Sequence, residues 1–116
     1  MAIKSSTVTI MVKDMDSSIA FYQSLGLTLQ DRWGEHYAQM TAPGLILGIH
    51  PANQKEFVGS GNTSIGFSID NFDEAKILLD KLSIEVNETQ DGGGQILLFN
   101  DPDGTSLYFY KLIWEQ

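Results

Sequence analysis

The sequence predicts an α+β fold made of two copies of one βαβββ module. The first sign is a repeat, because an alternating apolar segment near the N-terminus recurs 57 positions later. The matched residues are Val8, Ile10 and Val12 in the first copy and Ile65, Phe67 and Ile69 in the second. The second sign is that a helix-like pattern follows each segment, and the third is a polar, glycine-containing stretch between the copies. One half-sheet cannot enclose a core alone, so the two modules are expected to form an eight-strand open cradle with the helices on its convex face.

The first module is expected at residues 1–52 and begins with a strand over residues 8–12. Its apolar residues alternate with polar ones, which predicts a strand with one face in a core. Asp16 or Ser17 is expected to cap the following helix, and Gly26 suits the position just after its end. The three remaining strands are predicted at residues 28–32, 35–40 and 45–50.

The whole chain is expected to be one domain, in which a linker over residues 53–62 joins the second module over residues 63–116. Period-two and helical patterns define its elements in the same order as in the first module. The strand, the helix and the three later strands are expected at residues 64–69, 72–82, 84–87, 95–99 and 106–111. Residues 91–94, Asp-Gly-Gly-Gly, are interpreted as a flexible hairpin turn, because a phosphate loop would need a lysine and a following helix.

The composition excludes several classes of function. The net charge is −8, with 15 acidic and 7 basic residues, so nucleic acid is not expected as a partner. The chain has no cysteine, which excludes thiol catalysis, thiolate metal sites and disulfides. No apolar run is long enough to span a membrane, and the first residues do not resemble a signal peptide. A cytoplasmic location is therefore expected.

Two segments carry a family resemblance. The first is the strand over residues 8–12 followed by Asp14-Met15-Asp16-Ser17-Ser18-Ile19-Ala20-Phe21-Tyr22, and the second is Asn100-Asp101-Pro102-Asp103-Gly104 with the strand after it. Together they resemble the glyoxalase / bleomycin-resistance / ring-cleaving dioxygenase group, the vicinal oxygen chelate superfamily. The resemblance covers essentially the whole chain and implies the same glyoxalase-like cradle. Asp101 and Asp103 resemble a general-acid pair in composition, but in this turn they are expected to be structural.

Enzymes of that family hold a divalent metal at four positions, which are normally His, Glu or Gln. The corresponding residues here are Thr7, Gly48, Ser64 and Tyr108. Glycine has no ligand atom, the two hydroxyls are weak neutral ligands, and a tyrosine binds iron only when it is deprotonated. No metal and no other cofactor is therefore expected, and the family's Lewis-acid step has no visible support in the sequence.

Strand alternation predicts which residues face the cavity of the cradle. The expected ligand-binding residues are Thr7, Thr9, Met11, His50, Ser64, Ser68, Tyr108 and Tyr110. His50 could serve as a proton shuttle or hydrogen-bond donor at the cavity mouth, or it could be an exposed residue at the end of a strand. Trp33, Tyr37 and Trp114 are further aromatic candidates for stacking on a planar or cationic ligand.

The resemblance and the lost metal positions favour a metal-independent protein that binds a small organic molecule, for sequestration or sensing. One alternative is a lyase, isomerase or dioxygenase with an atypical site, and another is a degenerate protein whose cradle serves dimerisation. Open sheet edges favour pairing, so a homodimer is expected, although Lys4 and the C-terminal tail could instead cover the edges of a monomer.

Overall fold

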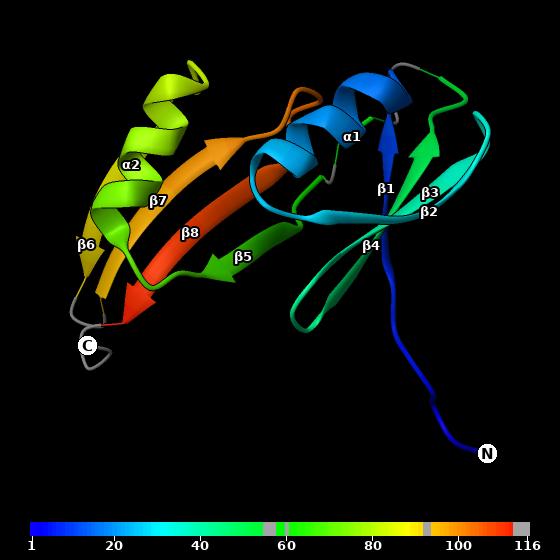
Figure 1. Cartoon of the computed structure of the whole chain (residues 1–116), viewed down its shortest axis with the longest axis horizontal. Helices are drawn as coiled ribbons and strands as arrows, with labels where there is room; N and C mark the ends of the chain where they lie inside the picture. Colours follow the sequence, from blue (N-terminus) through cyan, green and yellow to red (C-terminus); the bar gives the residue numbers. More distant parts are fainter. Residues whose placement is uncertain (55–57, 60, 92–93, 113–116) are drawn as a thin grey trace. The chain divides into compact units, whose positions relative to one another are not determined.

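The computed structural model describes residues 1–54, 58–59, 61–91 and 94–112, and the chain divides into two compact units, Met1–Ser60 and Gly61–Gln116. Each unit contains one helix and one four-stranded sheet in the order strand, helix and three strands (Figure 1). The predicted α+β fold of two βαβββ modules is therefore confirmed.

Unit 1 builds its sheet around a parallel pair of strands. Its elements are β1 (Val8–Val12), α1 (Met15–Ser24), β2 (Thr28–Trp33), β3 (Tyr37–Ala42) and β4 (Leu45–Pro51). The sheet order is β1-β4-β3-β2, in which β1 and β4 are parallel and the other neighbours are antiparallel. The first and last strands of the module thus lie side by side at one end of the sheet.

The core face of this sheet follows from period-two alternation. The side chains that share this face and are buried are Ile10, Val12, Ala38, Met40, Leu47 and Ile49. Val8 was expected in the core with them, but 41% of it is exposed. Val8 shares the face through its pairing with Leu47, yet it is the first residue of β1, where the sheet ends. The alternation was correct and the expected burial of Val8 was wrong.

The N-cap of helix α1 lies earlier in the sequence than predicted. Asp14 is the N-cap, and its carboxylate accepts hydrogen bonds from the Asp16 backbone N–H (3.1 Å) and the Ser17 hydroxyl (2.8 Å). Asp16 and Ser17, the predicted caps, are therefore donors to the cap rather than caps. Gly26 follows the C-cap with φ of 107°, a left-handed conformation that glycine adopts at little cost, as predicted.

Unit 2 repeats the arrangement with different residues. Its elements are β5 (Ser64–Ser68), α2 (Phe72–Lys81), β6 (Asn87–Asp91), β7 (Gly94–Asn100) and β8 (Ser106–Leu112). The order is β5-β8-β7-β6, with β5 and β8 parallel. The buried face carries Ile65, Leu97, Phe99, Leu107 and Phe109, and α2 packs mainly against β8. Asn71 caps α2 by accepting a hydrogen bond from the Glu74 backbone N–H at 3.0 Å.

The strand predicted at residues 84–87 lies further toward the C-terminus. Ser83 takes a positive φ of 58°, and the Ile84 backbone N–H donates to the Leu79 carbonyl at 2.9 Å. This contact closes the end of α2, so Ile84 belongs to the helix terminus and β6 begins only at Asn87. The predicted hairpin at residues 91–94 falls partly outside the described residues.

The Asp-Pro-Asp-Gly turn before β8 has the predicted structural role. The Asp101 carboxylate accepts from the backbone N–H groups of Asp103 (2.9 Å) and Thr105 (2.8 Å), and Gly104 takes φ of 89°. Asp101 is only 5% exposed, so these bonds hold a buried carboxylate in the turn. Within the described ranges, no helix has both the length and the apolar character needed to cross a bilayer.

Candidate functional site

Unit 1 presents a mainly polar sheet face on the side opposite its buried core. Directly paired residues share a face, and one row across the sheet consists of Thr9, Gly48, Gln39 and Asp31. Thr9 and Asp31 are exposed and Gln39 is half-buried. Gly48 is buried although it has no side chain, which means that neighbouring side chains cover it.

Tyr37 is one of the side chains that cover Gly48. A Cβ added at Gly48 would lie 2.5 Å from both the Tyr37 hydroxyl oxygen and Thr9 Oγ1. Gln39 Nε2 donates a hydrogen bond to the same Tyr37 hydroxyl at 3.2 Å, and the Trp33 ring stacks on the Tyr37 ring at 5.6 Å. The centre of this face is therefore a phenol hydroxyl held over a glycine, with an indole that is 52% exposed beside it.

His50 is half-buried and shares this face, where it pairs with Met11. Its Nδ1 lies 2.8 Å from the Pro51 carbonyl oxygen. Because a carbonyl oxygen only accepts, Nδ1 carries the proton in this contact, and Nε2 of a neutral ring is then an acceptor. On the other edge of β1, the Met11 carbonyl accepts a hydrogen bond from the Gly59 backbone N–H at 3.1 Å.

Unit 2 presents a corresponding face that is richer in aromatic and aliphatic groups. Register places three rows on it, and their members are Ser64 with Ser106, Gly66 with Tyr108 and Leu98, and Ser68 with Tyr110 and Ile96. Ser64 and Ser68 are exposed, both tyrosines are half-buried, and 42% of Leu98 is exposed. This face offers hydroxyl groups and rings to a ligand.

Tyr108 lies across Gly66 on the neighbouring strand. The three atoms nearest to a Cβ built on Gly66 all belong to the outer part of the Tyr108 side chain, well inside van der Waals contact. The Tyr110 ring lies 5.7 Å from the Tyr108 ring at an interplanar angle of 40°. Each unit thus places one tyrosine over one glycine at the middle of its polar face.

The predicted ligand-binding residues therefore fall into two groups, one in each unit. Thr9, Met11 and His50 share the polar face of unit 1, and Thr7 lies one residue before β1 as an exposed residue. Ser64, Ser68, Tyr108 and Tyr110 share the polar face of unit 2. The predicted aromatic candidate Trp114 lies outside the described residues.

The residues at the family's metal positions do not fit a divalent transition metal. Gly48 offers no donor atom and is covered by the Tyr37 hydroxyl, whereas Thr7 and Ser64 offer only neutral hydroxyls. Tyr108 lies over Gly66 rather than among carboxylates or imidazoles. Over the described part of the chain, no three His, Cys, Asp or Glu side chains gather in a way that could hold an ion. Zn²⁺, Ni²⁺ and Fe²⁺ favour imidazole and carboxylate donors, so these four positions do not provide the ligand set for a metal-assisted reaction step.

Comparison with protein families gives a match over residues 4–109 to the Glyoxalase/Bleomycin resistance protein/Dioxygenase superfamily. The chain belongs to this superfamily. Superfamily membership agrees with the resemblance in the sequence and with the two βαβββ modules. Comparison with curated proteins gives no match.

Several experimental structures share the fold at low sequence identity. The genomically encoded fosfomycin resistance protein FosX from Listeria monocytogenes has a TM-score of 0.81 at 21% identity, covering 99% of this chain and 95% of that one. TnmS3, an antibiotic binding protein from Streptomyces sp. CB03234, has a TM-score of 0.78 at 21% identity, covering 97% and 98%. Lactoylglutathione lyase from Agrobacterium tumefaciens has a TM-score of 0.73 at 21% identity, covering 95% and 92%. Identities this low establish the fold alone.

Sequence reasoning identified the tyrosines but missed the residues that position them. Gln39 was not singled out, although it donates to Tyr37. Gly66 lies within the strand predicted at residues 64–69, but its contact with Tyr108 was not predicted. The sequence contained a signal for the contact between Tyr108 and Gly66, because a glycine inside a strand often marks a close approach by another group.

Proposed function

We propose that this superfamily member binds a small organic molecule without a metal, through the polar faces of its sheets, in order to sequester or sense it. The observation that carries the proposal is the replacement of the family's metal positions by Thr7, Gly48, Ser64 and Tyr108. A superfamily scaffold without imidazole or carboxylate ligands at those positions retains a binding surface but loses the means to polarise a substrate through an ion.

The two tyrosine-over-glycine arrangements support the same proposal. Tyr37 and Tyr108 each present a ring and a hydroxyl at the middle of a face, and each is held by its packing against a neighbouring strand. Rings supply stacking area and hydroxyls supply orientation, which is the usual composition of a small-molecule site. One structural relative, TnmS3, is an antibiotic binding protein, which is the same class of function.

The enzyme alternative is favoured by one specific observation. The Pro51 carbonyl holds His50 with its Nδ1 protonated, which leaves Nε2 free to accept a proton when the ring is neutral. A lyase or isomerase reaction that needs one base and no metal would be compatible with this geometry.

A protein that serves only dimerisation is the third possibility, and a site filled by its own side chains would favour it.

Metal content and retained ligand are the first test. We expect freshly purified, tag-free protein to show well under one ion per chain by elemental analysis after incubation with Zn²⁺, Ni²⁺, Mn²⁺ and Fe²⁺ and subsequent washing. Native mass spectrometry of the same sample reports retained ligand and oligomeric state together. One tightly held ion, lost in a variant of a residue on the polar faces, would contradict the proposal and favour the enzyme.

Ligand binding can be followed by isothermal titration calorimetry, which detects a ligand on the polar face of either unit. Fosfomycin and a panel of planar aromatic compounds are suitable probes. For a probe that binds, Tyr108→Ala should weaken affinity between a few-fold and about a hundredfold, which corresponds to roughly 1–3 kcal/mol for a stacked ring. Gln23→Ala, at an exposed position on α1 and outside both polar faces, is the matched control. An unchanged affinity in folded Tyr108→Ala would remove Tyr108 from the site.

We also propose that the chain is a homodimer in the cytoplasm. Sheet edges favour pairing, and the absence of cysteine suits a reducing compartment. Light scattering at high micromolar concentration should give twice the chain mass of 12.9 kDa. A monomeric mass across that range would contradict the dimer without affecting the binding proposal.

A further inference from the structure

A groove on the helix side of unit 2 is separate from the polar faces described above. It lies between α2 and the strands β6 and β7, has a volume of about 500 Å³, and we call it the α2 groove. Its lining residues are Lys76, Ile77, Asp80, Ile84, Val86, Glu88 and Leu97. Leu97 pairs with Phe109, a core residue, whereas Tyr108 and Tyr110 face the other side of the same sheet. The α2 groove and the tyrosine face therefore lie on opposite sides of the sheet.

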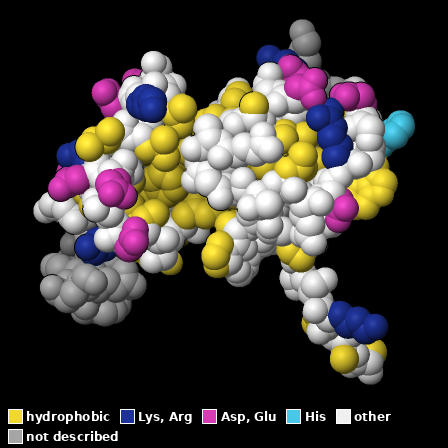
Figure 2. All heavy atoms as spheres, viewed as in Figure 1, with side chains coloured by type: hydrophobic (Ala, Val, Ile, Leu, Met, Phe, Trp, Pro, Cys, Tyr) yellow, Lys and Arg dark blue, Asp and Glu magenta, His cyan; other side chains and the backbone are white. Residues whose placement is uncertain are grey.

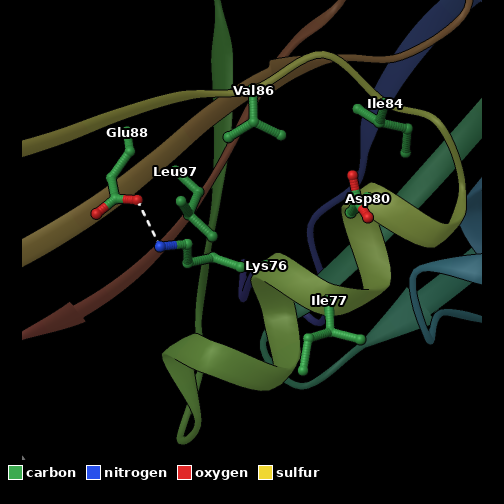
Figure 3. Close-up of a pocket in the computed structure, with 7 residues that line it drawn as sticks. All are labelled: Lys76, Ile77, Asp80, Ile84, Val86, Glu88 and Leu97. Carbon is green, nitrogen blue, oxygen red and sulfur yellow. Dashed lines mark ion pairs between the residues drawn. The ribbon is translucent and has the colours of Figure 1, made fainter.

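The walls of the α2 groove are apolar. Leu97 forms a fully buried floor, Ile84 and Val86 are half-buried, and 68% of Ile77 is exposed on α2. Figure 3 shows the Ile84 and Val86 side chains across the groove from the helix that carries Ile77. A helix normally buries residues of this kind, so the groove leaves apolar surface that an apolar group could cover.

The charges at the groove leave one carboxylate without a counterion among the described residues. Lys76 Nζ and Glu88 Oε1 form an ion pair at 2.9 Å, drawn as the dashed line in Figure 3, and this pairing raises the pKa of Lys76. The remaining charge of the lining is therefore that of Asp80, for which the structure gives no ion pair. Asp80 also lies in the last turn of α2, where the helix carbonyl groups favour a cation.

The charge of the chain as a whole also favours a cationic ligand. In Figure 2, hydrophobic side chains over α2 lie beside charged ones of both signs. The chain as a whole carries a net charge of −8, which raises the local concentration of small cations. A volume of about 500 Å³ also lies in the range of small-molecule sites, which run from about 300 to 1,000 Å³.

We propose that the α2 groove binds a hydrophobic amine, whose apolar body covers Ile77, Ile84 and Val86 and whose ammonium group pairs with the Asp80 carboxylate. A fatty or aryl acid is disfavoured, because its carboxylate would meet Asp80 and Glu88, and Lys76 is already paired. An uncharged molecule of the same shape would cover the apolar wall but leave Asp80 without a partner.

The experiment compares three probes of equal shape on the full chain: 4-phenylbutylamine, 4-phenylbutanol and 4-phenylbutanoate. Backbone amide NMR titration should show the amine shifting signals of α2 and of residues 84–88. We expect the amine to bind about three- to fivefold more tightly than the alcohol, which is the upper part of the gain that an exposed ion pair provides, and the acid to bind most weakly.

Asp80→Asn is the decisive variant, and Asp73→Asn is its matched control, because Asp73 lies in the first turn of the same helix and outside the groove. Asp80→Asn should reduce amine affinity to that of the alcohol and leave the alcohol unchanged, whereas Asp73→Asn should change neither by more than about twofold. Ile77→Ser should weaken all three probes.

Several results would overturn the proposal. These are no shift with any probe at millimolar concentration, equal affinity for amine and alcohol, and equal effects of the two aspartate variants. Shifts confined to Tyr108 and Tyr110 would place the amine on the tyrosine face instead, which would support the proposed function while contradicting this inference.

Discussion

The contact between Tyr108 and Gly66 can be tested by adding one methyl group. In Gly66→Ala the new Cβ would overlap the outer atoms of the Tyr108 ring, so the ring must rotate away from β5. Gly66 is not among the glycines with positive φ, so alanine causes no backbone strain there. The steric contact with Tyr108 therefore decides how Gly66→Ala changes the free energy of unfolding.

The magnitude follows from two opposing effects. Overpacking costs about 1–3 kcal/mol, and a half-buried ring that can move should give a value of about 1.5 kcal/mol. Replacing glycine by alanine in a strand stabilises by about 0.5–1 kcal/mol. We therefore expect Gly66→Ala alone to reduce the free energy of unfolding by about 1 kcal/mol, and the same change in a Tyr108→Ala background to raise it by about 0.5 kcal/mol.

Urea denaturation followed by circular dichroism measures this cycle. With a slope of about 1–1.5 kcal/mol/M, the midpoint should fall by about 0.7–1 M in the first case and rise by about 0.3–0.5 M in the second. Gly48→Ala is the matched control, because the side chains nearest to it belong to Thr9 and Tyr37, so Tyr108→Ala should not rescue it. If Gly66→Ala costs the same with and without Tyr108, the reasoning about this contact is wrong.

Three further predictions concern local interactions. Thr105 is fully buried and its hydroxyl has no hydrogen-bond partner among the described residues, so Thr105→Val should raise the thermal midpoint, with a gain of up to about 1 kcal/mol; a loss would indicate a partner such as buried water. Asn71→Ala should cost about 1 kcal/mol in urea denaturation because the Glu74 N–H loses its cap, and Asn71→Ser should restore most of it. The Ser17 hydroxyl bond lowers the pKa of Asp14 below its ordinary value of 3.8, so the stabilisation is present above that pH and is lost as the pH falls through the folded pKa. The difference in urea midpoint between wild type and Asp14→Asn should therefore shrink below about pH 4, and a constant difference would refute this assignment.

The sequence was sufficient to predict the fold where strands have one buried face. Leu47 and Ile49 in β4, and Leu107 and Phe109 in β8, follow the same alternation, and all four are buried because each strand is central in its sheet. β6 was misplaced for the opposite reason. It is an edge strand with the sequence Asn-Glu-Thr-Gln-Asp, which has no apolar residue and so no detectable period. Ile84 and Val86 carried the apparent pattern, but they line the α2 groove instead.

The site was predictable only to the level of which face a residue occupies. Register confirms that Tyr108 and Tyr110 share a face, since alternation is a local property of one strand. That Tyr108 covers Gly66, and that Tyr37 covers Gly48, depends on side-chain conformations across neighbouring strands, which no spacing along the chain encodes. The N-cap was misassigned by two or three positions for a similar reason, because Asp14, Asp16 and Ser17 are all capping residues by type.

The polar composition of β6 bears on how folded copies of this chain meet in concentrated solution. As the last strand of its sheet, β6 leaves a row of backbone donors and acceptors open among the described residues. A second strand could pair with that row, but it would find no apolar side chain on β6 to bury. Edge-to-edge aggregates nucleated here would therefore lack the dry interface that makes cross-β assemblies persistent, and they should dissolve on dilution. Replacing Thr89 by valine or isoleucine would place an apolar side chain on β6 and so favour more persistent aggregates.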